Sequence, residues 1–127
     1  MAKTIVIKRK AVQVDMQIDK GSTFRSDLIW LIGTPLTPKD LTGWTARMQL
    51  RLDIDDTEIL HELTTENGGI LIDGANGKIS LFISDTDSTA FDWEEAVYGL
   101  ELIDTQNTND VRRLTYGVLS AFDEVTR

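Results

Sequence analysis

The sequence predicts an all-β fold, an antiparallel sandwich of about eight strands. From Trp44 to Leu52, apolar residues alternate with polar ones without a break, as they do in a strand with one buried and one exposed face. Segments of this kind recur at regular spacing, separated by turns rich in glycine, asparagine or proline. The sequence shows no amphipathic segment long enough for a regular helix. Together these observations favour a sandwich or barrel over an α/β fold.

Three strands are expected before the first proline, at residues 4–7, 11–18 and 23–32. The second strand places four apolar side chains on one face, namely Val12, Val14, Met16 and Ile18. The inner face of the third strand is expected to hold Phe24, Leu28, Trp30 and Ile32, with the polar Ser26 as an exception. Residues 20–22 are typical of a turn, and residues 33–40 contain both prolines and are expected to form a loop.

The alternating strand comes next, and its inward side chains are predicted to be Trp44, Ala46, Met48, Leu50 and Leu52. Its outward side chains are predicted to be Arg47, Gln49 and Arg51. Extended structure is expected again at residues 58–63, and the Gly-Ala-Asn-Gly sequence at 74–77 predicts a hairpin. A helical turn is expected near residues 88–91. Two long strands, 97–104 and 111–123, complete the pattern.

This number of strands in 127 residues fits an immunoglobulin-like sandwich best, and residues 1–127 are expected to form a single domain. The chain contains no cysteine, which excludes disulfides, thiolate catalysis and cysteine-ligated metals. Its net charge of −8 argues against nucleic acid as a partner. No apolar run approaches the roughly 20 residues needed to span a bilayer, so no membrane partner is expected.

Charge is unevenly distributed along the chain. Residues 1–10 carry four basic groups and no acid, whereas the remaining residues carry 9 basic and 21 acidic groups, a balance of −12. Such an arm can dock on an acidic surface, and its apolar residues can add as a short strand to a sheet edge. We therefore predict that this segment contributes to assembly rather than to the core of its own subunit. The residues concerned are Lys3, Ile5, Ile7, Lys8, Arg9 and Lys10. A solvated terminus is the alternative.

Candidate catalytic and metal-binding residues are few. His61 is the one histidine, and its alternation with Ile59 and Leu63 is typical of a partly buried strand residue. The acidic run at 53–58 lacks the spacing of an EF-hand loop, so a solvated loop is expected and calcium binding is the alternative. The glycine-rich turns lack the Gly-Lys-Ser/Thr sequence of a P-loop. We expect no enzyme activity, no cofactor and no transition metal.

Two pairs of residues have both a structural and a functional interpretation. Arg47 and Arg51 project from the polar face of one strand. They can pair across strands within the sheet or contact a carboxylate-rich partner. Phe91 and Trp93 lie in a polar segment. They can form an exposed aromatic interface or pack the loop onto the end of the sandwich.

Six elements of the sequence, taken together, resemble a pattern of small virion proteins of tailed phages and prophages. They are Asp19-Lys20-Gly21-Ser22-Thr23-Phe24, Leu41-Thr42-Gly43-Trp44-Thr45-Ala46-Arg47, Gly68-Gly69-Ile70, Gly77-Lys78-Ile79-Ser80-Leu81, Val97-Tyr98-Gly99-Leu100-Glu101-Leu102 and the ending Gly117…Glu124-Val125-Thr126-Arg127. Their order is similar to that of the immunoglobulin-like N-terminal domain of phage baseplate upper proteins. The resemblance covers most of the chain and is carried by turn glycines and alternating apolar residues.

The resemblance implies a non-enzymatic structural protein of a tailed-phage particle, in the tail, baseplate or neck. Such a protein is made in the host cytoplasm and located in the virion. We expect self-association into a homo-oligomer and docking on other phage virion proteins. Baseplate upper proteins continue into a region that carries the receptor-binding assembly, whereas this sequence ends after the sandwich, so an adaptor role is expected. The alternatives are a capsid decoration protein and a free carbohydrate-binding β-sandwich module.

Overall fold

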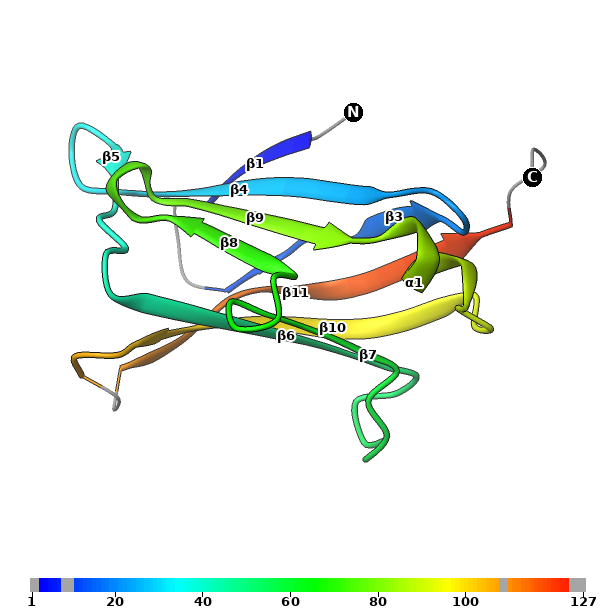
Figure 1. Cartoon of the computed structure of the whole chain (residues 1–127). Coiled ribbons are helices and arrows are strands. Elements are labelled where there is room, and N and C mark those ends of the chain that lie inside the picture. The colour runs from blue at the N-terminus through cyan, green and yellow to red at the C-terminus, as the bar shows by residue number, and fades with distance from the viewer. Residues whose placement is uncertain (1–2, 8–10, 108–109, 124–127) are drawn as a thin grey trace.

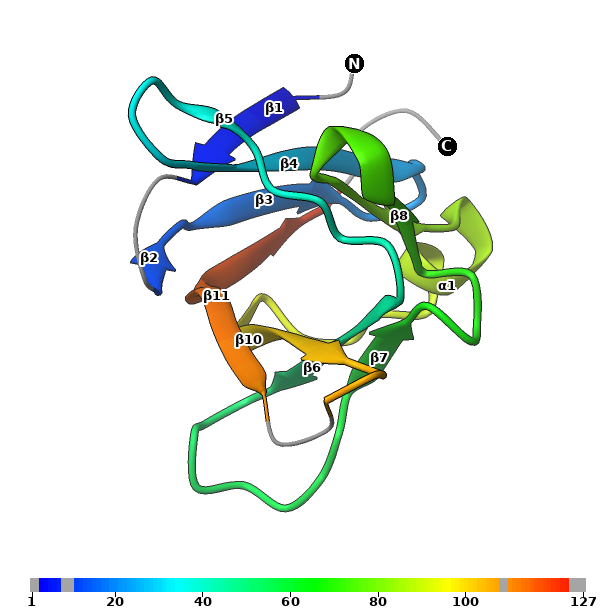
Figure 2. The same ribbon diagram turned by 90° about the vertical axis from the view of Figure 1, so that its left-hand side faces the viewer.

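Two β-sheets packed face to face form the structure, a computed structural model that describes residues 11–107 and 110–123 in full and the backbone of residues 3–7. Figure 1 shows the two layers and the core between them, and Figure 2 shows the same layers from the end. The predicted all-β sandwich is therefore confirmed. The helical parts of the described chain are short: η1 (Gly74–Asn76) and α1 (Asp85–Thr89).

One sheet has five strands and the other has six. The five-stranded sheet has the order β1 (Lys3–Ile7), β4 (Phe24–Ile32), β9 (Lys78–Ile83) and β8 (Ile70–Asp73), and β5 (Thr37–Pro38) pairs with the end of β4. The six-stranded sheet has the order β2 (Val12–Gln13), β11 (Val111–Phe122), β10 (Glu95–Asp104), β6 (Trp44–Arg51) and β7 (His61–Thr64), and β3 (Met16–Asp19) also pairs with β11.

Antiparallel pairing dominates both sheets, as predicted, but three pairings among the described strands are parallel. Strand β1 runs parallel to β4, and β2 and β3 run parallel to β11. All three exceptions lie in the first 19 residues, which place β1 on the edge of one sheet and β2 and β3 on the edge of the other (Figure 2). Because the chain reverses both between β1 and β3 and again between β3 and β4, β4 returns in the direction of β1 (Figure 1).

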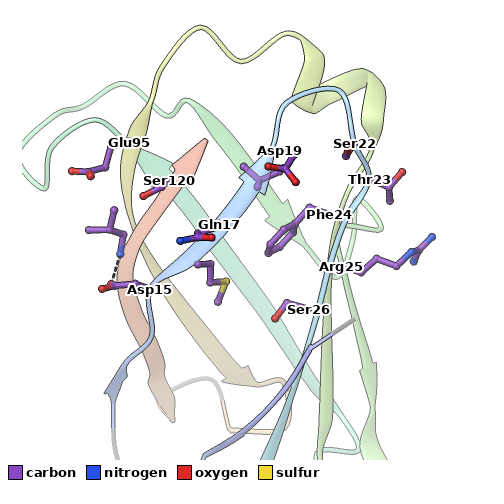
Figure 3. Close-up of a pocket in the computed structure, with 13 residues that line it drawn as sticks. Asp15, Gln17, Asp19, Ser22, Thr23, Phe24, Arg25, Ser26, Glu95 and Ser120 are labelled. Carbon is purple, nitrogen blue, oxygen red and sulfur yellow. Dashed lines mark hydrogen bonds between the residues drawn. The ribbon is translucent and has the colours of Figure 1, made fainter. Parts of the chain in front are cut away.

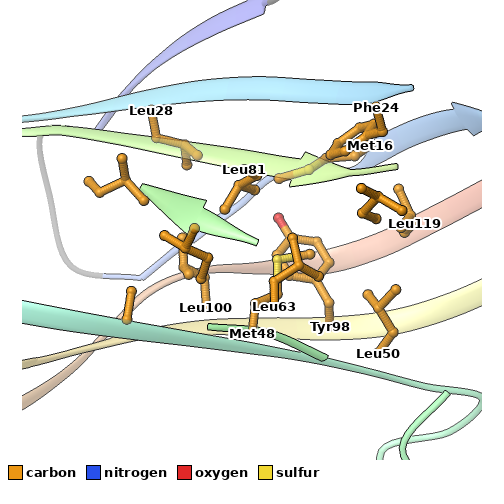
Figure 4. Close-up of a cluster of buried hydrophobic side chains, with 14 of the residues drawn as sticks. Met16, Phe24, Leu28, Met48, Leu50, Leu63, Leu81, Tyr98, Leu100 and Leu119 are labelled. Carbon is orange, nitrogen blue, oxygen red and sulfur yellow. The ribbon is translucent and has the colours of Figure 1, made fainter. Parts of the chain in front are cut away.

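The core lies between the two sheets and is formed by alternate residues of each strand (Figure 4). The burial of Ala46, Met48 and Leu50 confirms the predicted inner face of β6. Leu52, which was also predicted to face inward, is 53% exposed because β6 ends at Arg51. Trp44 is partly buried and contacts Trp30 edge to face, with ring centroids 6.0 Å apart.

Strand β4 follows the predicted pattern except at its end. Phe24, Leu28 and Trp30 are buried, and the polar Ser26 is buried beside them, as predicted. Ile32 is 42% exposed, which contradicts its predicted inner position. The reason is its place at the last residue of the strand, where the chain turns before the short strand β5 pairs back onto β4. The predicted loop at 33–40 therefore contains a strand, which holds Pro38.

Strand β11 contains one residue more than the stretch of β10 that it pairs with. Leu100 pairs with Thr115 and Glu101 pairs with Arg113, so the intervening Leu114 has no partner in β10. Leu114 and Thr115 are both buried, and the alternation of β11 changes phase here, as at a β-bulge. The bulge places Arg113 and Tyr116 on the same outer face, whereas an unbroken strand would place them on opposite faces.

The edge strand beside β11 is interrupted at Val14 and Asp15, between β2 and β3. At the interruption, the Tyr98 hydroxyl donates a hydrogen bond to the carbonyl of Val14. The Asp15 carboxylate accepts a hydrogen bond of 3.0 Å from the backbone N–H of Val118. A Cβ added at Gly117 would lie 2.6 Å from the Val14 oxygen, so the glycine allows the edge segment to approach β11 closely.

The segment between β9 and β10 packs onto one end of the sandwich. Ser84 caps α1 by accepting a hydrogen bond of 3.1 Å from the N–H of Asp87, so the helical turn begins earlier than predicted. The buried Ser88 hydroxyl accepts a hydrogen bond from the N–H of Gly21 and donates one to the carbonyl of Ser22. These bonds join the segment to the turn between β3 and β4.

We predict that Met48→Asp unfolds the domain. The Met48 side chain has no solvent exposure, and an aspartate there would bury an unpaired charge. Burying an unpaired charge costs several kcal/mol, out of a total free energy of unfolding of about 5–15 kcal/mol. Arg47→Ala is the matched control, because its exposed ion pair with Glu101 is worth about 0–1 kcal/mol. Thermal unfolding followed by circular dichroism measures both, and an unchanged midpoint for Met48→Asp would refute the assignment.

We also predict that Tyr98 makes stability fall with rising pH between about 10 and 12. Burial raises the pKa of Tyr98 to about 12, and the neighbouring Thr115 hydroxyl lowers it only in part. The unfolded tyrosine ionises near pH 10, so above that pH the unfolded state has lost the proton that the folded state keeps. Two pKa units correspond to about 3 kcal/mol. Urea unfolding across this range should show a smaller loss in Tyr98→Phe, and an identical loss would contradict the prediction.

Candidate functional site

One hollow on the described surface is a cleft between the edges of β3 and β4. Its volume is about 990 Å³. Phe24 points into it, whereas Arg25 extends from the other side of β4, away from the cleft (Figure 3). Three carboxylates line it, from Asp15, Asp19 and Glu95, and Arg25 is its one cation, which gives a net charge of −2. The Asp15 carboxylate is held by the backbone of Val118, so this cleft belongs to the edge interruption described above.

The second hollow, here called the outer groove, lies on the solvent face of the six-stranded sheet and has a volume of about 490 Å³. The strand register arranges its lining in three rows across β6, β10 and β11. The rows are Arg51, Val97 and Val118, then Gln49, Gly99 and Tyr116, then Arg47, Glu101 and Arg113. Ile54, from the segment that follows β6, completes the wall. The groove therefore has a glycine at its centre and arginines at its corners.

The outer groove is basic although the chain is acidic. Three arginines and one glutamate line it, a net charge of +2 on a chain of net charge −8. Arg47 forms an ion pair of 3.2 Å with Glu101. Arg51 donates hydrogen bonds to the Gln49 side chain and to the Asp56 carbonyl, which are neutral acceptors. Within residues 11–107 and 110–123, neither Arg51 nor Arg113 has a carboxylate within ion-pair distance.

Tyr116 and Arg113 form an exposed unit at one side of the groove. The Arg113 guanidinium lies over the Tyr116 ring, 5.0 Å from its centroid, and the tyrosine is 37% exposed. On the other side, the Gln49 amide donates a hydrogen bond of 2.7 Å to Glu62 of β7, so that carboxylate is held beside the groove rather than within it. The groove thus combines an aromatic wall with cations that retain hydrogen-bonding capacity.

The structure shows which contacts Arg47 and Arg51 make within this chain. Arg47 pairs across strands with Glu101, as the ordinary interpretation predicts. Arg51 bonds within its own strand and to the following loop. The sequence therefore predicted the outward face of β6. Gly99, Arg113 and Tyr116 were not singled out, although a glycine in the interior of a strand is a recognisable signal of close approach.

Phe91 and Trp93 were proposed as interface residues, but both are buried in this chain, at 9% and 6% exposure. Their rings contact each other with centroids 4.7 Å apart, and Phe91 also contacts His61 edge to face. The alternative interpretation therefore holds: these aromatics pack the loop onto the end of the sandwich. A sequence pattern cannot reveal this, because the segment around them is polar and its contacts with the body, such as those of the buried Ser88, join residues far apart in the sequence.

The N-terminal arm is placed in part. The backbone of β1 pairs in parallel with β4 of the same chain, from Lys3 opposite Ser26 to Ile7 opposite Trp30. The predicted strand addition therefore occurs within the subunit, on the edge of β4. Lys8, Arg9 and Lys10 lie outside the described residues. A role of Lys3, Ile5 and Ile7 in assembly stays a prediction.

His61 is half-buried in β7, as predicted. Burial lowers the pKa of His61, and the nearby Asp87 raises it in part. The acidic run at 53–58 is exposed. Within the described residues, no group of three or more histidine, aspartate or glutamate side chains is placed to hold a metal ion. In the same part of the chain, no helix has the length and apolar character required to cross a membrane.

Comparison with known proteins identifies the fold. No protein-family model matches the chain, and no curated protein matches it by sequence. Among solved structures, the N-terminal domain of phage TP901-1 ORF48 is similar, with a TM-score of 0.56 and 12% sequence identity. The match covers 96% of this chain and 99% of that one. The fold is therefore shared with a domain of a phage protein, over nearly the whole of both chains.

We predict that deleting residues 2–10 separates the structural role of the arm from its role in assembly. Removing β1 exposes the edge of β4, whose backbone groups then lose their partners. The truncated chain should remain folded, with a lower melting temperature, and should self-associate less than the full chain in light scattering. If it fails to fold, β1 is an ordinary structural strand; if it associates as well as the full chain, the arm has no part in assembly.

Proposed function

We propose that the protein is a non-enzymatic structural component of a tailed-phage particle that self-associates and docks on a neighbouring virion protein. The observation that carries the proposal is the fold, which matches a phage protein domain end to end. We place the protein in the tail, baseplate or neck, as an adaptor. The sequence resemblance to the N-terminal domain of baseplate upper proteins supports this position.

The surface of the six-stranded sheet supports docking as the mode of action. The outer groove is bordered by the segment between β6 and β7, which projects from the sandwich (Figure 1). This segment carries three exposed apolar side chains: Leu52 at 53%, Ile54 at 81% and Ile59 at 40%. Apolar side chains gathered on a surface mark an interaction site more often than scattered ones do. The groove and this segment together are the proposed docking surface.

A non-enzymatic role agrees with the chemistry of the described surface. The imidazole of His61 packs against the Phe91 ring, with centroids 5.4 Å apart. Within the described residues it has no hydrogen bond to a hydroxyl nucleophile. The β3–β4 cleft is lined by carboxylates and hydroxyls but by no histidine or lysine, and within the described residues no carboxylate of the cleft is hydrogen-bonded to one of its hydroxyls. Neither hollow contains the nucleophile, base and orienting group that hydrolytic catalysis requires.

The proposal predicts that the protein is present in purified phage particles. Particles from the host or phage that carries the gene are purified on a density gradient, and tails are separated from heads. Mass spectrometry of the fractions should find the chain in tails, in constant ratio to a major tail protein. Its presence in tailless heads would instead favour a capsid decoration protein. Its absence from every particle fraction would refute the proposal.

A further inference from the structure

We infer that the outer groove binds an acidic, extended segment of the neighbouring virion protein, with one apolar side chain over Gly99 and carboxylates on Arg51 and Arg113. The inference rests on the proposed docking function and adds the chemistry of the partner. Three observations carry it: the glycine at the centre of the groove, the two arginines without carboxylate partners, and the spacing of the rows.

Gly99 creates the hollow at the centre of the groove. A Cβ added at this position would meet no atom within 4 Å, and its φ is not positive. Neither crowding nor backbone conformation therefore requires a glycine here. A glycine in a strand interior weakens the strand and often marks a place where a ligand or another backbone approaches closely. The missing side chain leaves room between Gln49 and Tyr116, its neighbours in the middle row.

Charge selects the kind of partner. Glu101 is the one carboxylate of the groove and is paired with Arg47. Arg51 and Arg113 remain with neutral contacts, a side-chain amide and a carbonyl for Arg51 and the Tyr116 ring for Arg113. A guanidinium in this state retains donors suited to a carboxylate in a bidentate pair. An acidic segment would thus offer carboxylates to Arg51 and Arg113, which have none within ion-pair distance in the described chain.

The spacing of the rows selects the shape of the partner. Arg51 lies in the row of Val97 and Arg113 in the row of Glu101, with Gly99 midway between them. Along the strands the two rows are about 13 Å apart, and β6 and β11 are about 9.6 Å apart across β10, so the backbones of Arg51 and Arg113 lie about 16 Å apart on a diagonal. A segment that crosses the groove obliquely spans about 13 Å from residue i to residue i+4, with alternate side chains on the same side, and the long arginine side chains reach the remaining distance. Acidic, apolar and acidic residues at positions i, i+2 and i+4 of the partner would therefore match Arg51, Gly99 and Arg113 in turn.

The test is a titration of the full chain with short peptides, followed by NMR of its backbone amides. The probe is the acetylated, amidated pentapeptide Asp-Ser-Leu-Ser-Glu. The matched probe Asn-Ser-Leu-Ser-Gln has the same shape without charge. The acidic peptide should shift the amides of Val97, Gly99 and Glu101 in β10 and of Tyr116 and Val118 in β11. The neutral peptide should bind about tenfold more weakly, the loss expected when contacts of hot-spot strength are removed.

Three variants identify the groove as the site. Gly99→Leu fills the hollow and should weaken binding of the acidic peptide about tenfold. Arg113→Gln removes one exposed ion pair and should weaken that binding about threefold to fivefold. Neither substitution should lower the melting temperature. Arg112→Gln is the matched control, because Arg112 is the adjacent arginine, is paired with Asp110 at 2.6 Å and does not line the groove. It should bind as the unaltered chain does. If Gly99→Leu is poorly folded, the binding measured for Arg113→Gln decides whether the groove is the site.

Several outcomes would overturn the inference. One is the absence of any shift with the acidic peptide, and another is equal binding of the neutral peptide. A third is a set of shifts confined to the cleft lined by Asp15 and Phe24. A fourth is a shift of the groove amides with protein concentration alone, because that would indicate that a second copy of the chain occupies the groove. The proposed function is judged separately. If the unaltered chain and Gly99→Leu enter phage particles equally well, the inference fails and the function stands. If the unaltered chain is absent from particles, the function fails even where the peptide binds.

Discussion

Strand β10 determines both the core and the outer groove, because it pairs with β6 on one side and with β11 on the other. Its inward side chains, Ala96, Tyr98, Leu100 and Leu102, are buried, and the outward residues between them line the groove. A slip of one residue would bury Glu101 and expose the apolar set, so hydrophobic burial fixes the register. The same register places Gly99 between Gln49 and Tyr116. Groove substitutions can therefore be tested without altering the core.

The strands and their inner faces could be predicted because alternation is a local property of the chain. Alternation predicts which face of β6 is buried, and the structure buries Ala46, Met48 and Leu50 on that face. The errors lie at strand ends, where a tertiary effect decides. Strand β7 begins opposite Leu50, and beyond Arg51 the chain leaves the sheet, so Leu52 is exposed although the alternation continues to it. Ile32 is exposed for the same reason at the end of β4.

The candidate site was predictable only on one of its three strands. Arg47 and Arg51 face outward as the alternation of β6 requires. Arg113 and Tyr116 differ in position by an odd number of residues, so an unbroken strand would have separated them. The bulge at Leu114 brings them together, and no glycine or proline lies within two residues of it in the sequence. Likewise, the parallel pairing of the first strands depends on two reversals of the chain in space, which periodicity does not report.

The size of the outer groove limits what it can contribute. Stable protein interfaces bury about 1,200–2,000 Å² in total, far more than one hollow the size of a few side chains can supply. In the proposed docking, the groove would therefore act as an anchor, and the exposed apolar residues between β6 and β7 would have to supply further area. Selectivity follows from charge, since a chain of net charge −8 repels acidic partners over most of its surface. Only a segment whose shape brings its carboxylates onto Arg51 and Arg113 gains attraction, so the acidic body excludes the partners that the groove does not fit.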